Sequence, residues 1–460
     1  MTLEEKQKTE DSNFFKKQNG ITEGVIWKQL LLFFFPLLFG TFFQQLYNTA
    51  DAIIVGKFVG KIALSAVGGT TGTLINVLVG FFVGISSGAT ISISQFYGAR
   101  NNKKVESSVH TGIALAIGGG FTIMFLGLMF ARPALAAMGT PEDIIPYSLI
   151  YLRIYFLGMI PNLVYNIGAG ILRAVGDSKR PLYFLITGTL ANIILDLFFV
   201  IVLKMGVAGA ALATIMSQSL SAILVCRTLM KTNDSYRLVL IKIKFHKEML
   251  TRILSIGLPA GFQSLMYSVS NVIIQANINR FGTDTIAAWT AYGKIDGLFW
   301  MTITAFGISI TTFVGQNYGA GLYKRVRKGV REALVLSFAV SIGLIVILYN
   351  FGGYILQWFS DDLNVVEIGT QMLKFLVPMF ITFICIEILS GALRGMGSSL
   401  IPMLLTCFGV CIFRVVWLFI AVPIWPTIKT VMISYPITWV TTSVLFIIYY
   451  LFYVKKKQIV

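Results

Sequence analysis

The feature that most constrains this chain is the recurrence of long apolar runs, separated only by short polar or basic loops. A helix needs about 20 apolar residues to cross the hydrocarbon core of a bilayer. Of the 460 residues, 56% are hydrophobic and only 12% are charged, whereas soluble domains carry about 25% charged residues. We therefore predict an all-α polytopic membrane protein with twelve transmembrane helices. The predicted spans are 30–56, 62–97, 110–131, 146–172, 181–203, 206–228, 250–279, 284–318, 330–350, 365–393, 400–424 and 428–453.

The net charge of +17 invites a nucleic-acid interpretation, but the positions of the basic residues argue against it. They gather in every second loop, whereas the loops between carry few. This alternation is the positive-inside rule, so we predict a multi-pass plasma-membrane protein with both termini cytoplasmic, and no nucleic-acid partner. The first 28 residues lack the apolar core of a secretory signal. The basic clusters lie at 100–104, 173–180, 227–252, 324–331 and 455–457.

The sequence contains an internal repeat. SQFYGAR at 94–100 recurs as GQNYGAG at 315–321, and LRAVGDSKRP at 172–181 recurs as LRGMGSSLIP at 393–402. One offset, 221 residues, relates both pairs (315 − 94 and 393 − 172). An even number of spans per repeat predicts two parallel six-helix halves around a central cavity. The predicted parts are a cytoplasmic tail at 1–28, a first half at 29–229, a basic cytoplasmic linker at 230–249, a second half at 250–454 and a cytoplasmic tail at 455–460.

The repeated motifs themselves have structural explanations. Their glycines are expected to end helices and to form tight turns. Arg173 and Arg394 are expected to cap helix carbonyls or to meet lipid phosphates near the cytoplasmic side.

The two halves differ in two carboxylates. Asp51, in QQLYNTADAIIVG, aligns with Asn271, and Asp196, in ANIILD, aligns with Trp417. A charged side chain at the centre of a membrane helix costs about 2.5–3.5 kcal/mol on insertion scales. Because the repeat alone would supply the scaffold twice, two acids confined to one half suggest a specialised function.

The two acids are predicted to lie at similar depths in the membrane. Counted from the outer helix ends at 1.5 Å per residue, Asp51 lies roughly 9 Å deep, and Asp196 and Thr214 roughly 12 Å deep. Asn192 precedes Asp196 by one helical turn and shares its face. Such a group can hold a proton or a cation and release it, as a coupling site does. The alternative is a structural role, in which protonated acids bond to Asn192, Thr214 and Tyr47.

At these residues the sequence resembles the multidrug and toxic compound extrusion (MATE) family, particularly its DinF-like branch. The resemblance covers nearly the whole chain and depends on LYNTADAIIVG, LRAVGDSKRP, ANIILD and GVAGAALAT (206–214). It implies two six-helix bundles that export diverse, mostly cationic compounds against a H+ or Na+ gradient. It places the coupling site at the matching positions, and it marks Pro36 as the point where the first helix bends. The implied coupling residues, for H+ or alternatively Na+, are Asp51, Asn192, Asp196 and Thr214.

The sequence also suggests a substrate cavity between the halves, formed within a monomer and surrounded by membrane lipid. No cofactor is expected beyond the coupling ion, for which H+ is favoured because two close acids can share a proton. Another branch of the family uses acids in the seventh and tenth helices; here the seventh has none. The predicted cavity residues are Gln44, Gln45, Tyr47, Asn48, Met266, Tyr267, Asn271, Lys294, Asp296 and Glu387.

Two other functions compete with small-molecule export. A flippase for lipids or lipid-linked sugars would need several cations in its cavity to hold a phosphate; the sequence offers Lys294 and Arg414 well inside spans. A membrane-embedded enzyme would need a constellation of metal ligands or a nucleophile. His110 and His246 are the only histidines, and both lie near the cytoplasmic ends of predicted spans, so an enzyme is the least favoured class.

Overall fold

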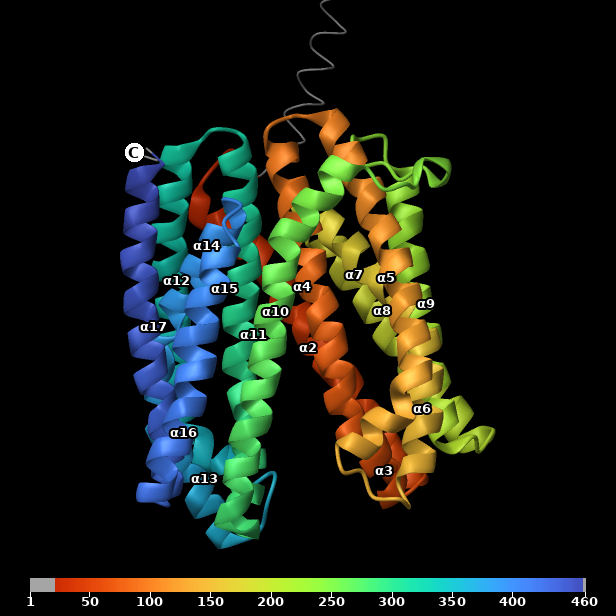
Figure 1. Ribbon diagram of the computed structural model, residues 1–460, viewed down its shortest axis with the longest axis vertical. Helices are drawn as coiled ribbons and strands as arrows, with labels where there is room; N and C mark the ends of the chain where they lie inside the picture. Colours follow the sequence, from red (N-terminus) through yellow and green to blue (C-terminus); the bar gives the residue numbers. More distant parts are fainter. Residues whose placement is uncertain (1–20, 458–460) are drawn as a thin grey trace, which may run out of the picture.

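The computed structural model describes residues 21–457, and in that range all twelve predicted spans are helical and no strand occurs (Figure 1). The parts of the predicted tails at 1–20 and 458–460 lie outside the described residues. The helices of the first half are α2 (Ile26–Phe58), α3 (Lys61–Gly68), α4 (Thr70–Gly98), α5 (Asn102–Ala137), α6 (Ile145–Leu157), α7 (Met159–Ala174), α8 (Lys179–Asp196) and α9 (Gly206–Lys231). Those of the second half are α10 (Lys247–Ile278), α11 (Thr283–Gly319), α12 (Tyr323–Leu356), α13 (Leu363–Leu376), α14 (Ile384–Gly395), α15 (Leu400–Thr406), α16 (Phe413–Ile424) and α17 (Ile428–Lys456).

Ten of these spans are long and apolar enough to cross a bilayer, and α6 with α7, bent by 50°, forms an eleventh. The remaining one is α10, which has 32 residues but is more polar. Its polar side chains include Gln263, Ser264 and Asn271, which line a cavity between the halves. A helix that faces a cavity and another protein surface needs less lipid-compatible surface, which accounts for its composition.

Two spans contain a π-helical segment. A π-helical segment (Leu197–Val202) directly follows Asp196, and a second one (Cys407–Ile412) ends two residues before Arg414. Within a membrane such backbone is tolerated where protein or a cavity surrounds it, and π segments are frequent at functional sites. Each segment therefore adjoins a charged residue buried in its own half.

The basic loops gather at one end of the molecule, together with the start of α2 and the end of α17 (Figure 1). We call this end, formed by the loops at 99–101, 175–178, 232–246 and 320–322, the basic end. At this end Arg325 donates hydrogen bonds to the carbonyl oxygens of Ile21, Glu23 and Gly24. The segment that precedes α2 is thus fixed against the start of α12.

The first helix of each half begins in the core of the other half. Ile26, Leu30 and Phe34 of α2 belong to the core of the second half, where the rings of Phe34 and Phe306 stack with centroids 4.0 Å apart. Met249 of α10 belongs to the core of the first half and accepts a hydrogen bond from Ser108. Farther along α2, Ile54 and Val55 return to the core of the first half, so α2 spans both cores.

Glycines let α4 and α10 approach until their backbones touch. A Cβ atom added at Gly84 would collide with the backbone of Gly261, and one at Gly88 with the backbone of Ile253 and Gly257. Small residues four apart allow this close packing, which supplies the van der Waals contact that drives helix association in lipid. The seam between α4 and α10 therefore holds the two halves together by close van der Waals packing.

The repeated motifs form a reciprocal clasp across the seam at the basic end. Gln95 of the first half donates to the carbonyl oxygen of Gly395 (2.7 Å), and Gln316 of the second half donates to that of Ala174 (2.6 Å). The helix-ending glycines Gly98 and Gly319 also meet across the seam, because a Cβ at either would collide with the carbonyl of the opposing glutamine. Their expected helix-end role is confirmed, and the structure adds this contact between the halves.

The two halves converge at the basic end and diverge toward the opposite end, where α3 and α6 lie far from α13 and α16 (Figure 1). The close approaches of α4 to α10 extend from Gly88 to Gly80, where an added Cβ atom would collide with the side chain of Ser264. The clasp and the seam thus close one end of the molecule.

We expect Gly84→Ala to lower the free energy of unfolding by about 1–3 kcal/mol, because the added methyl meets backbone that cannot move aside. The matched control is Gly343→Ala in α12, where an added Cβ has nothing within 4 Å. The control should be neutral or stabilising by up to about 1 kcal/mol, since alanine favours helix. Thermal unfolding in detergent measures both, and equal melting temperatures would show that the seam is not tightly packed.

Candidate functional site

The four residues predicted to form a coupling site do come together, buried inside the first half. Asp51 comes from α2, Asn192 and Asp196 from α8, and Thr214 from α9, and none is more than 5% exposed. Thr214 Oγ1 lies 3.4 Å from Asp51 Oδ2. The side chains of Asn192 and Asp196 both interact with that of Asp51. We call these four residues the acidic cluster.

Hydrogen bonding within the acidic cluster is incomplete. Both amide atoms of Asn192, both carboxyl oxygens of Asp196 and Oδ1 of Asp51 are buried without a hydrogen-bond partner among the described residues. Buried polar atoms of this kind are costly unless a further group joins them. The donor set, two carboxylates with an amide and a hydroxyl oxygen, fits either a shared proton or a small hard cation such as Na+.

Tyrosines from two helices complete the surroundings of the acidic cluster. Tyr47 and Tyr151 both interact with Asp51 and Thr214, and Tyr155 interacts with Asp51 and Gln218. The sequence analysis included Tyr47 but missed Tyr151 and Tyr155. Their one-turn spacing in YLRIYF was the available signal, but it did not show that α6 faces α2.

The other predicted residues of α2 are placed unevenly. Gln44 and Tyr47 line a small cavity in the first half, of about 70 Å³, together with Asn162. Gln45 and Asn48 are exposed and are not among the residues that line it. Pro36 lies inside α2, which runs as one continuous helix.

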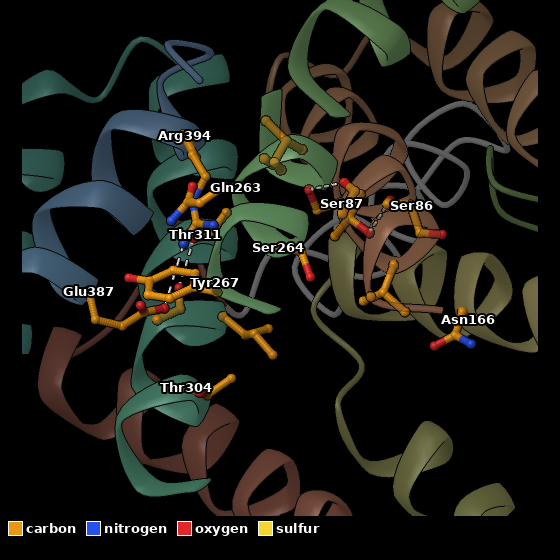
Figure 2. Close-up of a pocket in the computed structure, with 18 of the residues that line it drawn as sticks. Ser86, Ser87, Asn166, Gln263, Ser264, Tyr267, Thr304, Thr311, Glu387 and Arg394 are labelled. Atoms are coloured by element: carbon orange, nitrogen blue, oxygen red, sulfur yellow. Dashed lines mark hydrogen bonds and ion pairs between the residues drawn. The ribbon is translucent and has the colours of Figure 1, made fainter. Parts of the chain in front are cut away.

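A central cavity of about 470 Å³ lies between the halves, lined by α4, α7, α10, α11 and α14 (Figure 2). Of the predicted residues, Tyr267, Asn271 and Glu387 line it, whereas Met266 does not. Figure 2 shows Glu387, Tyr267 and Arg394 on one wall, with Ser86, Ser87 and Asn166 opposite.

Both repeated arginines also line the central cavity, which the sequence did not predict. Arg394 forms an ion pair with Glu387 at 3.5 Å. The residue that corresponds to Glu387 in the first half is Asn166, so the repeat gives Arg173 no equivalent acid. The sequence had suggested that both arginines cap helix carbonyls or meet lipid phosphates. In the structure both side chains also face the central cavity.

A third cavity, of about 500 Å³, lies inside the second half and contains Asp296. It shares Tyr267, Asn271 and Glu387 with the central cavity, so the two are contiguous. Lys294 is exposed and lines neither. Aromatic side chains dominate the walls, and these are Trp289, Tyr292, Trp300, Phe383, Tyr435 and Trp439.

The two histidines form hydrogen bonds between the linker at 230–249 and α5. His110 Nε2 accepts a hydrogen bond from the backbone N–H of Val239 (3.1 Å), and His246 Nδ1 lies 3.2 Å from Thr111 Oγ1. Among residues 21–457, no group of three or more His, Cys, Asp or Glu side chains could hold a metal ion. A bound Na+ would therefore depend on amide and hydroxyl oxygens beside the two carboxylates.

The chain matches one protein-family model and many known proteins. The MatE model matches residues 36–198 and 259–420, once in each half. The chain is 28% identical to the probable multidrug resistance protein YoeA of Bacillus subtilis, over 94% of this chain and 95% of that protein. It is 24% identical to the multidrug export protein MepA of Staphylococcus aureus, over 82% of this chain and 84% of that protein.

Solved structures show the same fold. A multidrug and toxic compound extrusion transporter in its bent conformation superposes with a TM-score of 0.88 at 23% identity, over 95% of this chain and 98% of that chain. A MOP superfamily transporter from Pyrococcus furiosus, described as having a binding pocket of reversed polarity, also gives a TM-score of 0.88, at 22% identity and the same coverage.

We expect Asn192→Leu to lower the free energy of unfolding by about 1–3 kcal/mol, although leucine is similar in size. The Asn192 side chain interacts with Asp51 and Asp196, and leucine would leave these two buried carboxyl groups without that polar neighbour. Asn350→Leu, at an exposed position of α12, is the control and should change stability by less than about 0.5 kcal/mol. Chemical or thermal unfolding in detergent measures both; a leucine variant as stable as the wild type would mean that the amide contributes nothing to the acidic cluster.

Proposed function

This chain belongs to the MatE family of multidrug efflux transporters, and from that membership we propose that it exports small amphipathic cations in exchange for protons. It is a multi-pass membrane transporter and not an enzyme. The observation that carries the proposed coupling is the acidic cluster, which buries Asp51 and Asp196 together in one half only. Carboxylates buried in a membrane are otherwise rare and costly.

The coupling ion proposed is H+, with Na+ as the alternative at Asp51, Asn192, Asp196 and Thr214. Two acids in contact can hold one proton between them, because both cannot be ionised without a compensating charge. The unpaired oxygens of Asp196 support this, since a shared proton would satisfy at least one of them. Na+ would use the same carboxylates with the Asn192 and Thr214 oxygens.

Alternating access follows from the arrangement of the halves. If the basic end faces the cytoplasm, as the positive-inside rule requires, both termini are cytoplasmic and the protein is closed toward the cytoplasm. The central cavity then belongs to an outward-open state. Conversion to an inward-open state requires the Gln95 and Gln316 clasp to separate.

Helix α2 offers a route from the acidic cluster to the clasp. Its first turns pack in the core of the second half through Phe34, and Asp51 lies in the first half. Pro36 lies at the last of these turns, where its missing N–H leaves one helical hydrogen bond unmade. Proton loss or gain at Asp51 would thereby bias a helix that bends at Pro36 and contacts both halves.

Substrate is proposed to bind in the central cavity, near Tyr267, Asn271 and Glu387. Gln44, Gln45, Tyr47, Asn48, Met266, Lys294 and Asp296 remain predictions for the wider substrate path. An organic cation and a proton could compete for the same negative charge, which gives antiport directly. Because one chain supplies every wall of the cavity, a monomer in membrane lipid suffices.

Lipid or lipid-linked sugar flipping is the second candidate, and one observation favours it. Three arginines line the cavities, Arg173, Arg394 and Arg414, where the sequence had pointed to Arg414 and Lys294. Guanidinium groups bind phosphate well. Glu387 neutralises Arg394, however, and the acidic cluster has no evident use in moving an anionic headgroup.

We expect wild-type protein in liposomes to export a cationic dye under a pH gradient and not under a Na+ gradient. Asp51→Asn should reduce the pH-driven rate by about tenfold or more, because the substitution removes a carboxyl group of the proposed coupling site. Asp361→Asn, in an exposed loop far from the acidic cluster in sequence, is the matched control and should transport normally.

Each other result has a defined meaning. A folded Asp51→Asn variant that transports like the wild type would give Asp51 a structural role. Transport driven by Na+ alone would make Na+ the coupling ion. If the wild type moves no dye under either gradient, but exchanges a fluorescent lipid between leaflets, flipping replaces export as the function.

A further inference from the structure

We propose that the cavity inside the second half is a binding site for amphoteric aromatic molecules, which carry one cationic and one anionic group. Arg414 would bind the anion and Asp296 the cation. The inference deepens the proposed export function, since it names a substrate class, and it depends on that function only for the direction of transport. Three observations support it: two groups of opposite charge that line one cavity without forming an ion pair, the aromatic walls, and the lining residues shared with the central cavity.

Arg414 is a buried cation without an acidic partner. It is 4% exposed and lines the cavity, and its Nη2 donates a hydrogen bond to Thr438 Oγ1 at 2.9 Å. Its Nε atom is buried without a partner, and none of the five ion pairs among residues 21–457 includes it. The guanidinium lies 3.9 Å from the ring centroid of Tyr435, which compensates part of its charge.

Asp296 is the complementary group in the same cavity. Its Oδ2 accepts a hydrogen bond from Trp300 Nε1 at 2.7 Å, while Oδ1 is buried without a partner. Asp296 is in none of the five ion pairs among residues 21–457 either, so it forms no ion pair with Arg414. A buried charge without an oppositely charged partner is destabilising. A ligand with one charge of each sign would satisfy both groups at once.

The walls and size of the cavity suit an aromatic ligand. Trp289, Tyr292, Tyr435 and Trp439 supply π faces, which attract both flat rings and organic cations. The volume, about 500 Å³, is within the range of drug-sized sites. Tyr267, Thr304 and Glu387 line both this cavity and the central one, so the two cavities lie side by side.

The repeat argues that these charges are not part of the scaffold. At the 221-residue offset, Arg414 corresponds to Ile193 and Asp296 to Ile75. Tyr435, which Arg414 contacts, corresponds to Thr214 of the acidic cluster. Arg414 directly follows the position that corresponds to Asn192, so the second half has an arginine and an aromatic ring close to positions that form the acidic cluster in the first half. Because the first half folds with isoleucines at these positions, the architecture does not require the charges.

Binding of rhodamine B and of its methyl ester tests the site. Rhodamine B is zwitterionic near neutral pH, whereas the ester keeps only the cation. Fluorescence polarisation with purified wild-type protein in detergent should show rhodamine B binding about tenfold or more tightly than the ester, because only rhodamine B can pair with Arg414. Equal affinities, or tighter binding of the ester, would overturn the proposal without any variant.

Variants then assign each charge. Arg414→Gln should weaken rhodamine B binding by about tenfold or more and leave the ester within about twofold, and Arg414→Lys should restore part of the loss. Asp296→Asn should weaken both dyes. If Arg414→Gln weakens both dyes equally, Arg414 only shapes the cavity and the proposal fails. These measurements need no gradient, so they are independent of whether export is driven by H+, by Na+ or not at all.

Discussion

The contact on which the rest of this structure depends is the backbone-to-backbone approach of α4 and α10. Lipid offers no hydrophobic driving force between helices, so association requires close fit, and Gly84, Gly88, Gly257 and Gly261 provide it. The glutamine clasp extends this seam at the basic end. The close approaches extend from the basic end only to the middle of α4, at Gly80, and beyond that point the halves diverge, which leaves room for the central cavity.

The repeat supplies a scaffold, and function resides in the departures from it. Each half contains a π-helical segment beside a buried charge, but the charges are opposite: Asp196 in the first half and Arg414 in the second. The first half encloses its acids with tyrosines, whereas the second surrounds its arginine with a wide aromatic cavity. One architecture thus separates a proposed ion site from a proposed ligand site.

The first helix of each half begins in the core of the other half, and this arrangement couples the two halves. Phe34 of α2 is buried in the second half and Asp51 in the first, so any change in the bend of α2 acts on both cores. A packed interface of this kind has a few discrete arrangements and does not deform continuously. The intervening helix is therefore a physical route by which an ion bound at one site can bias the opening of a cavity elsewhere.

The sequence by itself determined the twelve helices, the two-fold repeat and the acidic cluster. The length of the apolar runs predicts the helices, the constant offset shows the repeat, and acids within apolar runs indicate the cluster, because such acids are costly in a membrane. It could not determine which faces meet. Tyr151 and Tyr155 join Asp51 only through the packing of α6 against α9, and Arg173 faces the central cavity although its motif suggested a helix cap. Residue spacing along one helix fixes its own face, whereas the partner of that face depends on the rotation and crossing of helices far apart in sequence, and only the tertiary structure decided that.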